Sequence, residues 1–223
     1  MVLMLLLTNT FSLISEIQPI RAETEQTRTG WYWPAGTGDT GGMLGFMGWN
    51  QAFNGWHLAQ DFKLDQGLPV YAIADGEVVL SGTDVGGYGL GGTPGGALVA
   101  RFKTSAGESF TTLYGHINNL HKEGNVEAGQ ILGYTNGYNH LHFGIHPGYE
   151  LAENPWSGYT HNESETYGWV DPVQFLLSNT ARAASDFPSF LILPLFMLAT
   201  LLAIVIYKKI LLTRNPAHAH APR

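Results

Sequence analysis

An all-β fold is predicted for residues 31–177. Short runs of valine, isoleucine, tyrosine and phenylalanine recur there between glycines, as expected for strands joined by turns. No long stretch in this part repeats its apolar residues with the 3.6-residue period of a helix. A content of 44% hydrophobic and 12% aromatic residues is ample for a core. Strands are expected at residues 70–74, 77–81, 97–103, 109–114, 130–134 and 140–146.

Residues 1–22 are expected to form a signal peptide or an uncleaved membrane anchor. An apolar run at residues 2–7 is followed by Ile20-Arg21-Ala22, which can end in a small-residue cleavage site. The run lacks the positive charges that normally precede it in a signal peptide, and a buried N-terminal strand is the alternative. Residues 23–30 are polar and have no apolar period, so they are expected to be a linker.

A transmembrane helix is predicted at residues 187–207. This run is uncharged and, at about 1.5 Å per residue, long enough to cross a hydrocarbon core of about 30 Å. A buried core helix is the alternative. Lys208 and Lys209 follow at once, so the positive-inside rule makes residues 208–223 a cytoplasmic tail. We therefore expect a single-pass cell-membrane protein whose folded domain, residues 31–177, lies outside the cytoplasm. Residues 178–186 would be a spacer between this domain and the membrane.

Charge and cysteine content exclude several kinds of partner and site. The formal net charge of −7 argues against nucleic acid, because phosphates require a basic protein face. The absence of cysteine excludes thiolate zinc sites, cysteine nucleophiles and disulfides.

One segment formally fits a nucleotide-binding motif. Gly87-Tyr88-Gly89-Leu90-Gly91-Gly92 matches G-x-G-x-x-G, but the glycines and the proline that follow cannot begin the required helix. We therefore expect a loop, and its lack of side chains suits a flexible wall beside a groove.

Two histidines are expected to share one strand face in Asn139-His140-Leu141-His142-Phe143-Gly144-Ile145. Side chains alternate along a strand, so His140 and His142 point one way while the apolar residues between them point the other. Two imidazoles over an apolar floor can bind a metal. Considered alone, this motif also fits two solvated surface histidines.

Three further residues carry the same kind of chemistry. His57 and Asp61 offer a nitrogen and a carboxylate, which zinc accepts at about 2.0–2.2 Å. Four residues of straight strand would separate their Cα atoms by about 13 Å, so sharing one ion requires a bend or bulge between them. His116 ends an apolar strand, just before a turn at Asn118-Asn119.

In this order, these pieces resemble the lysostaphin/LytM-type zinc metallopeptidases, which cut peptide cross-links in bacterial cell walls. The resemblance covers roughly residues 31–177. It rests on H-x-x-x-D, on Tyr-x-His after a threonine-rich strand, on His-Leu-His-Phe, on the glycine turn at Asp75-Gly76 and on Val170-Asp171-Pro172. It implies an antiparallel β-sheet/barrel-sandwich hybrid of the lysostaphin type (the duplicated hybrid motif), with residues 31–177 as the zinc metallopeptidase domain.

The resemblance also implies the roles of five residues. His57, Asp61 and His142 would hold zinc (Zn2+), while His116 and His140 would flank the metal-bound water as catalytic residues. Such a zinc keeps three protein ligands and one open position, where water has a pKa near 7. Imidazoles with a pKa of about 6.5 can take its proton and stabilise the oxyanion.

The implied function is that of a membrane-anchored zinc metalloendopeptidase acting on peptidoglycan cross-links. Its partners would be wall peptides and, through the C-terminal helix, the membrane; the sequence leaves a protein activator open. A non-catalytic peptidoglycan-binding or hydrolase-activating module of the same fold is the alternative, although all five positions are filled. A biotinyl- or lipoyl-type carrier is a third reading, but no lysine lies on a tight hairpin near Asp75-Gly76 or Ala128-Gly129.

Three departures from the family pattern bear on substrate preference. Ala59 stands where glycine is usual, and Gly144 where an acidic or other polar residue is common. The approach to the histidine pair, residues 135–139, is shorter than usual. An insertion at residues 147–169 carries Trp156, Tyr159 and other aromatic residues. We expect this insertion to form another groove wall or a packed surface loop.

Overall fold

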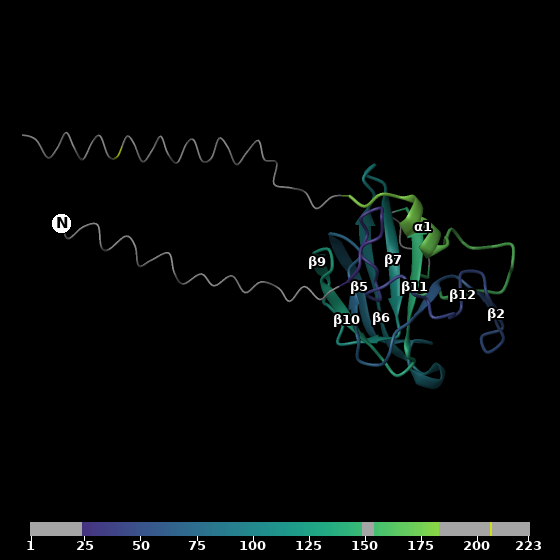
Figure 1. The fold of residues 1–223 in the computed structure, drawn as a ribbon. Coiled ribbons are helices and arrows are strands. Elements are labelled where there is room, and N and C mark those ends of the chain that lie inside the picture. The colour runs from purple at the N-terminus through teal and green to yellow at the C-terminus, as the bar shows by residue number, and fades with distance from the viewer. Residues whose placement is uncertain (1–23, 149–153, 183–205, 207–223) are drawn as a thin grey trace, which may run out of the picture. The chain divides into compact units, whose positions relative to one another are not determined.

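The computed structural model describes residues 24–148 and 154–182 and Ile206 (Figure 1). Within this part the chain consists mainly of strands, with one short α-helix, so the all-β prediction is confirmed. The elements are β1 (Trp49–Asn50), β2 (Gly55–His57), β3 (Gln60–Lys63), β4 (Pro69–Tyr71), β5 (Gly76–Val85), the 3₁₀ turn η1 (Leu90–Gly92), β6 (Gly95–Lys103), β7 (Ser109–Gly115), β8 (Ile117–Asn118), β9 (Gly124–Val126), β10 (Ile131–Thr135), β11 (His140–Pro147), β12 (Tyr159–Thr160) and α1 (Pro172–Ser178).

The strands form three antiparallel sheets. The largest has six strands in the order β3-β11-β7-β6-β5-β9, and the two smaller ones have the orders β4-β10-β8 and β1-β2-β12. In Figure 1, β2 and β12 are seen at the right, beyond β11, whereas β10 and β9, the edge strand of the large sheet, are seen at the left. All six predicted strands are present, as β4, β5, β6, β7, β10 and β11.

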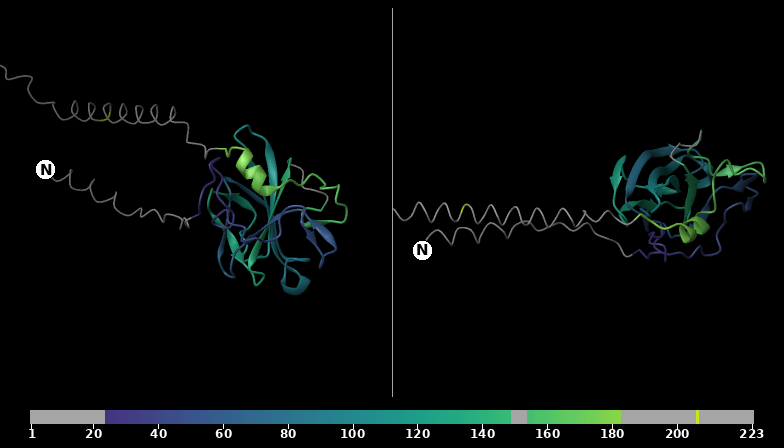
Figure 2. Two further views of the ribbon diagram at one scale, coloured as in Figure 1. Left: turned by 45° about the vertical axis from the view of Figure 1, so that its right-hand side comes forward. Right: turned by 90° about the horizontal axis from the view of Figure 1, so that it is seen from above.

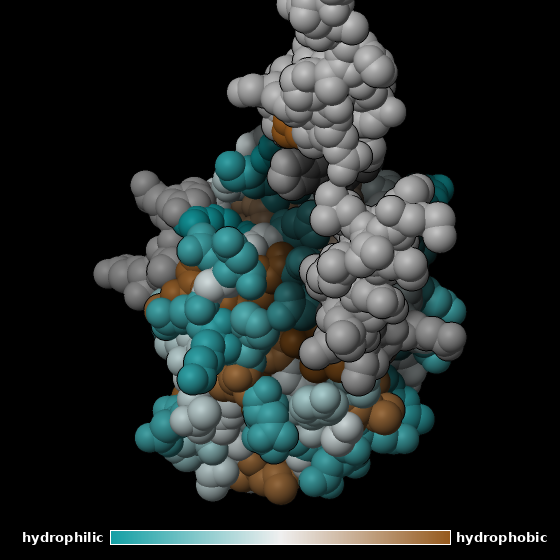
Figure 3. All heavy atoms as spheres, turned by 90° about the vertical axis from the view of Figure 1, so that its left-hand side faces the viewer, coloured by the Kyte–Doolittle hydropathy of each residue, from teal (hydrophilic) through white to brown (hydrophobic). Residues whose placement is uncertain are grey.

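The large sheet is buried on both faces. Along β6, Leu98, Ala100 and Phe102 pack into one apolar cluster, whereas Ala97 and Val99 pack into another on the opposite face. This follows from the alternation of side chains along a strand. On the surface shown in Figure 3, hydrophilic and hydrophobic residues of the described part are interspersed.

Strand β11 divides the core from the site, as its sequence predicts. Leu141, Phe143 and Ile145 are fully buried in the first of these clusters. Gly144 lies on the histidine face, where a Cβ atom would come within 2.7 Å of the Trp169 ring. The departure at Gly144 therefore makes room for a tryptophan from the end of the insertion.

The helix α1, which the sequence did not predict, lies beside β11 (Figure 2). The Asp171 carboxylate caps it by accepting hydrogen bonds from the backbone N–H groups of Val173 (2.9 Å) and Gln174 (3.1 Å). Pro172 occupies the first turn, where its missing N–H group costs little. With seven residues, α1 is too short to show a helical period.

Residues 24–30, expected to be a linker, lie against the domain. Thr27 is buried, and its backbone N–H donates to the carbonyl of Trp31. The fully buried Trp31 indole donates to the Asn179 carbonyl (2.6 Å), which ties the start of the domain to the end of α1.

The predicted terminal segments fall almost entirely beyond the described residues. Residues 1–22 and, apart from Ile206, residues 187–207 lie outside the described part. Within the part that is described, no helix has the length and apolar character needed to cross a membrane.

Candidate metal centre

His57 and Asp61 come from two different sheets. His57 is the last residue of β2, Asp61 lies in β3, and the chain bends at Leu58-Ala59 between them. This is the bend that a shared ion requires. Ala59 is fully buried at this point.

Strand pairing brings His142 and Tyr159 to the same place. His142 in β11 lies opposite Asp61 in β3, so the two side chains share one face of the large sheet. Tyr159 in β12 lies opposite His57 in β2. The pairings therefore gather three predicted ligands and one residue of the insertion.

The donor atoms of His57, Asp61 and His142 converge. The Nε2 atom of His57 lies 3.3 Å from Oδ1 of Asp61, and Nδ1 of His142 lies 3.4 Å from the same oxygen. The two nitrogens are 2.9 Å apart. Tetrahedral zinc with bonds of about 2.0–2.1 Å needs donor separations of about 3.3 Å. The buried Oδ1 atom makes no hydrogen bond, so the residues present fit a metal ion.

The other two predicted residues stand beside this cluster. Nε2 of His140 lies 3.6 Å from Oδ2 of Asp61, and the rings of His116 and His140 are 4.6 Å apart. Each ring uses its other nitrogen to bind a backbone carbonyl, His116 that of Tyr88 and His140 that of Tyr138, both at 3.0 Å. A carbonyl only accepts, so each Nδ1 carries the proton and, in the neutral ring, each Nε2 is an acceptor.

Burial sets the charge of the site. Burial alone would raise the pKa of Asp61, but the imidazoles of His142 and His57 outweigh it and hold that pKa far below its usual value. Burial lowers the pKa of His142 to about 4 and that of His116 to about 3, and neighbouring histidines add to both effects. At neutral pH, Asp61 is therefore ionised, whereas His116 and His142 are neutral. These are the forms needed for metal binding and for accepting a proton.

The metal-free protein should lose stability in mild acid. Histidines titrate near pH 6.5 in an unfolded chain, so from there down to about pH 4 the unfolded state binds more protons than the folded one. The free energy of unfolding keeps its highest value above about pH 6.5 and decreases as the pH is lowered. At about pH 5 the decrease is about 2 kcal/mol for each of His116 and His142. Urea unfolding of chelator-treated protein at about pH 7.5 and about pH 5 measures this. The variant His116→Gln should show a clearly smaller pH dependence; an equal dependence would contradict the assignment.

A cavity of about 270 Å³ opens beside the histidines. Its lining includes His116 and His142, the glycines Gly86 and Gly87, and four aromatic side chains: Phe53, Tyr88, Trp156 and Tyr159. The glycine-rich segment is thus a loop that forms one wall, as predicted. Its helical content is limited to η1, whose Gly91 has a left-handed φ of 65°.

The insertion contributes Trp156, Gly158 and Tyr159 to the lining. The Trp156 carbonyl accepts a hydrogen bond from the Tyr88 hydroxyl (2.9 Å), and the Gly158 carbonyl accepts one from the Leu58 N–H (2.9 Å). A Cβ atom on Gly158 would lie 3.1 Å from Cε1 of His142, so the wall touches a predicted ligand. Tyr167, in contrast, is 60% exposed and does not line the cavity.

Some residues of the site were not singled out in the sequence. The Asn50 side chain donates to the Tyr159 hydroxyl (3.0 Å), and Phe53 stacks on the Tyr159 ring with centroids 4.6 Å apart. Both come from β1 and the turn after it, which have no recognisable pattern. Tyr88 could have been noticed as the lone aromatic residue inside the glycine-rich segment.

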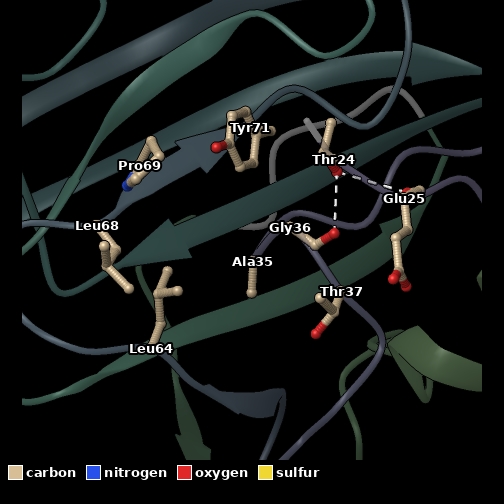
Figure 4. Close-up of a pocket in the computed structure, with 9 residues that line it drawn as sticks. All are labelled: Thr24, Glu25, Ala35, Gly36, Thr37, Leu64, Leu68, Pro69 and Tyr71. Atoms are coloured by element: carbon tan, nitrogen blue, oxygen red, sulfur yellow. Dashed lines mark hydrogen bonds between the residues drawn. The ribbon is translucent and has the colours of Figure 1, made fainter. Parts of the chain in front are cut away.

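A second cavity, of about 410 Å³, lies between the N-terminal segment and β4 (Figure 4). Leu64, Leu68 and Tyr71 form part of its lining, with Glu25 and Thr37 among the polar residues. One carboxylate without a histidine is a poor ligand set for zinc. The histidine-lined cavity is therefore the candidate site.

Comparisons with known proteins find similarity to peptidases. Residues 55–155 match the family model described as Peptidase family M23. A search of curated proteins finds no match. Solved structures that match include the catalytic domain of the antimicrobial peptidase lysostaphin from Staphylococcus simulans, with 27% identity, 55% of this chain and 80% of that chain covered, and a TM-score of 0.38. LytU matches with 22% identity, 58% and 79% coverage and a TM-score of 0.39. A zinc containing peptidase from Vibrio cholerae matches with 27% identity, 41% and 27% coverage and a TM-score of 0.33.

Proposed function

Because this chain carries a domain of peptidase family M23, we propose that it is a zinc metalloendopeptidase that hydrolyses peptide cross-links of bacterial cell-wall peptidoglycan. The observation that carries the proposal is the convergence of donor atoms from His57, Asp61 and His142 beside a cavity lined by His116. A binding module would need the cavity but not this buried ligand set.

His57, Asp61 and His142 would hold the zinc ion. When bound, zinc supplies a Lewis acid that makes water nucleophilic near neutral pH. The acceptor nitrogen of either His116 or His140 takes up the proton that the attacking water loses. The same imidazole, once protonated, returns that proton to the amide nitrogen that leaves, so the two new ends of the peptide are a carboxyl group and an amine. The other imidazole stabilises the negative charge on the carbonyl oxygen only in its protonated form, because Nε2 of the neutral ring has no proton to donate.

The cavity walls select the peptide. They consist of aromatic rings and glycines and carry no carboxylate or ammonium group among their lining residues. Tyr159 is held by Asn50 as a hydrogen-bond acceptor, which leaves its own hydroxyl proton for a substrate carbonyl. Such walls suit a short, flexible and uncharged peptide with small or D-configured residues rather than a folded protein.

Digestion of purified cell walls tests the function. The purified protein should release peptide fragments from peptidoglycan, identified by mass, and should cleave casein more slowly. An Asp61→Asn variant serves as the matched control, because it keeps the shape of the side chain but removes its charge. Binding to walls without release of fragments would favour a hydrolase-activating or wall-binding module instead.

We further propose that the domain lies outside the cytoplasm and is anchored by residues 187–207. The uncharged run motivates this, with Lys208 and Lys209 directly after it and the single Arg182 in the spacer before it, since each charge is costly to move through lipid. Protease added to intact spheroplasts should remove the domain. A domain that is degraded only after lysis of the membrane would rule out this topology.

A further inference from the structure

Asn136 connects the glycine-rich loop with the two segments that carry the candidate catalytic histidines. It follows β10, within the short approach to the histidine pair, and is only 6% exposed. Its side-chain Nδ2 donates to the Tyr88 carbonyl (2.8 Å), and its Oδ1 accepts from the Tyr138 N–H (3.0 Å). Its backbone N–H donates to the His116 carbonyl (2.8 Å). One buried residue thus binds the glycine-rich loop, the end of β7 and the start of β11.

Two of the residues that Asn136 contacts, Tyr88 and Tyr138, also supply the backbone carbonyls that orient His116 and His140. The Tyr88 carbonyl accepts from both Asn136 and His116 Nδ1, and a carbonyl oxygen has two lone pairs for this. The Tyr138 residue that donates to Asn136 accepts from His140 Nδ1 through its own carbonyl. A shift of Asn136 would therefore move the hydrogen-bond acceptors of both imidazoles.

The backbone at His116 also needs support. Its φ of 63° is in the left-handed region, which is strained for a residue with a Cβ atom. Such a conformation persists only where the surroundings hold it. The hydrogen bond from the Asn136 N–H to the His116 carbonyl is part of that surrounding structure.

A role in the turn alone does not account for Asn136. The bond from the Tyr138 N–H to Oδ1 is an ordinary local turn contact, which an aspartate would make equally well. The bond from Nδ2 to Tyr88 spans 48 residues and requires the amide. An aspartate would place a second acceptor against the Tyr88 carbonyl.

On these contacts, and resting on the proposed function, we propose that Asn136 is a positioning residue that sets the tautomer and orientation of His116 and His140. Asn136 is neither a member of the metal cluster nor one of the residues that line the cavity. It acts through the carbonyls of Tyr88 and Tyr138.

The variants Asn136→Asp and Asn136→Ala of the full chain test this. Asn125→Asp is the matched control, since Asn125 is exposed on β9. We expect kcat on a wall peptide to fall about 10- to 100-fold for both Asn136 variants, with KM and bound zinc little changed. Nitrogen spectra of labelled imidazoles should show that His116 loses its Nδ1–H tautomer in Asn136→Asp. The control should match the unchanged protein in each measurement.

Other outcomes would overturn the inference. Full kcat in Asn136→Asp, an unchanged His116 tautomer, or a loss of activity that only parallels the loss of zinc or of folded protein would each do so. An unchanged protein that is inactive on cell walls would instead remove the proposed function. The imidazole spectra of the Asn136 variants would still decide whether Asn136 sets the tautomer.

Discussion

Replacing His142 with alanine should remove both the metal and the activity. The His142 imidazole is 2% exposed, and its Nδ1 atom lies within 3.4 Å of donor atoms from both His57 and Asp61. Its loss leaves two donors, too few for a catalytic zinc site with three protein ligands. His57→Ala and Asp61→Ala should behave in the same way. Turnover should fall at least as far as on loss of a proton-transfer group, about 10²–10⁴-fold.

Metal content by plasma mass spectrometry, measured beside turnover, checks this result. His121→Ala is the control, because His121 bonds to Lys122 and Gln130 outside the cluster. It should keep both zinc and activity. Should His142→Ala retain zinc while His140→Ala loses it, the roles of these two histidines are exchanged.

Alanine at His116 or at His140 should give a different defect, in which activity is lost while zinc stays. Nε2 of His140 lies 3.6 Å from Oδ2 of Asp61, whereas His57 and His142 approach Oδ1. His116 directly follows β7. Removing such a group takes away a proton acceptor or an oxyanion partner, and costs about 10²–10⁴ in rate with the metal in place.

Metal content and turnover, measured together, distinguish these two variants from His142→Ala. His116→Ala and His140→Ala should hold zinc in the same ratio as the unchanged protein. If all five histidine and aspartate variants kept full activity, the enzyme interpretation would fail.

The sequence was most informative where a pattern is long. β11 has eight residues, and its alternation correctly separated the buried Leu141 and Phe143 from the histidine face. The need for a bend between His57 and Asp61 could be deduced from distance alone. Its form could not, because β2 and β3 have three and four residues, too few for a period-two pattern.

The walls of the site were harder to predict for the same reason. β1 and β12 have two residues each, and they exist because each pairs with β2 rather than because of local preference. The contact of Asn136 with Tyr88 joins residues far apart in the chain. In a sequence, a single asparagine beside a glycine indicates a turn. The turn is only one of the contacts that Asn136 makes.

The place where the insertion approaches His142 couples the cavity wall to the candidate metal site. The insertion residue Tyr167 is exposed and lies outside the cavity lining, so its side chain can change without disturbing the candidate metal ligands. Gly158 is different, because any larger side chain would press on the His142 ring. A substitution that changes the wall at Gly158 is therefore expected to change the proposed affinity for metal at the same time.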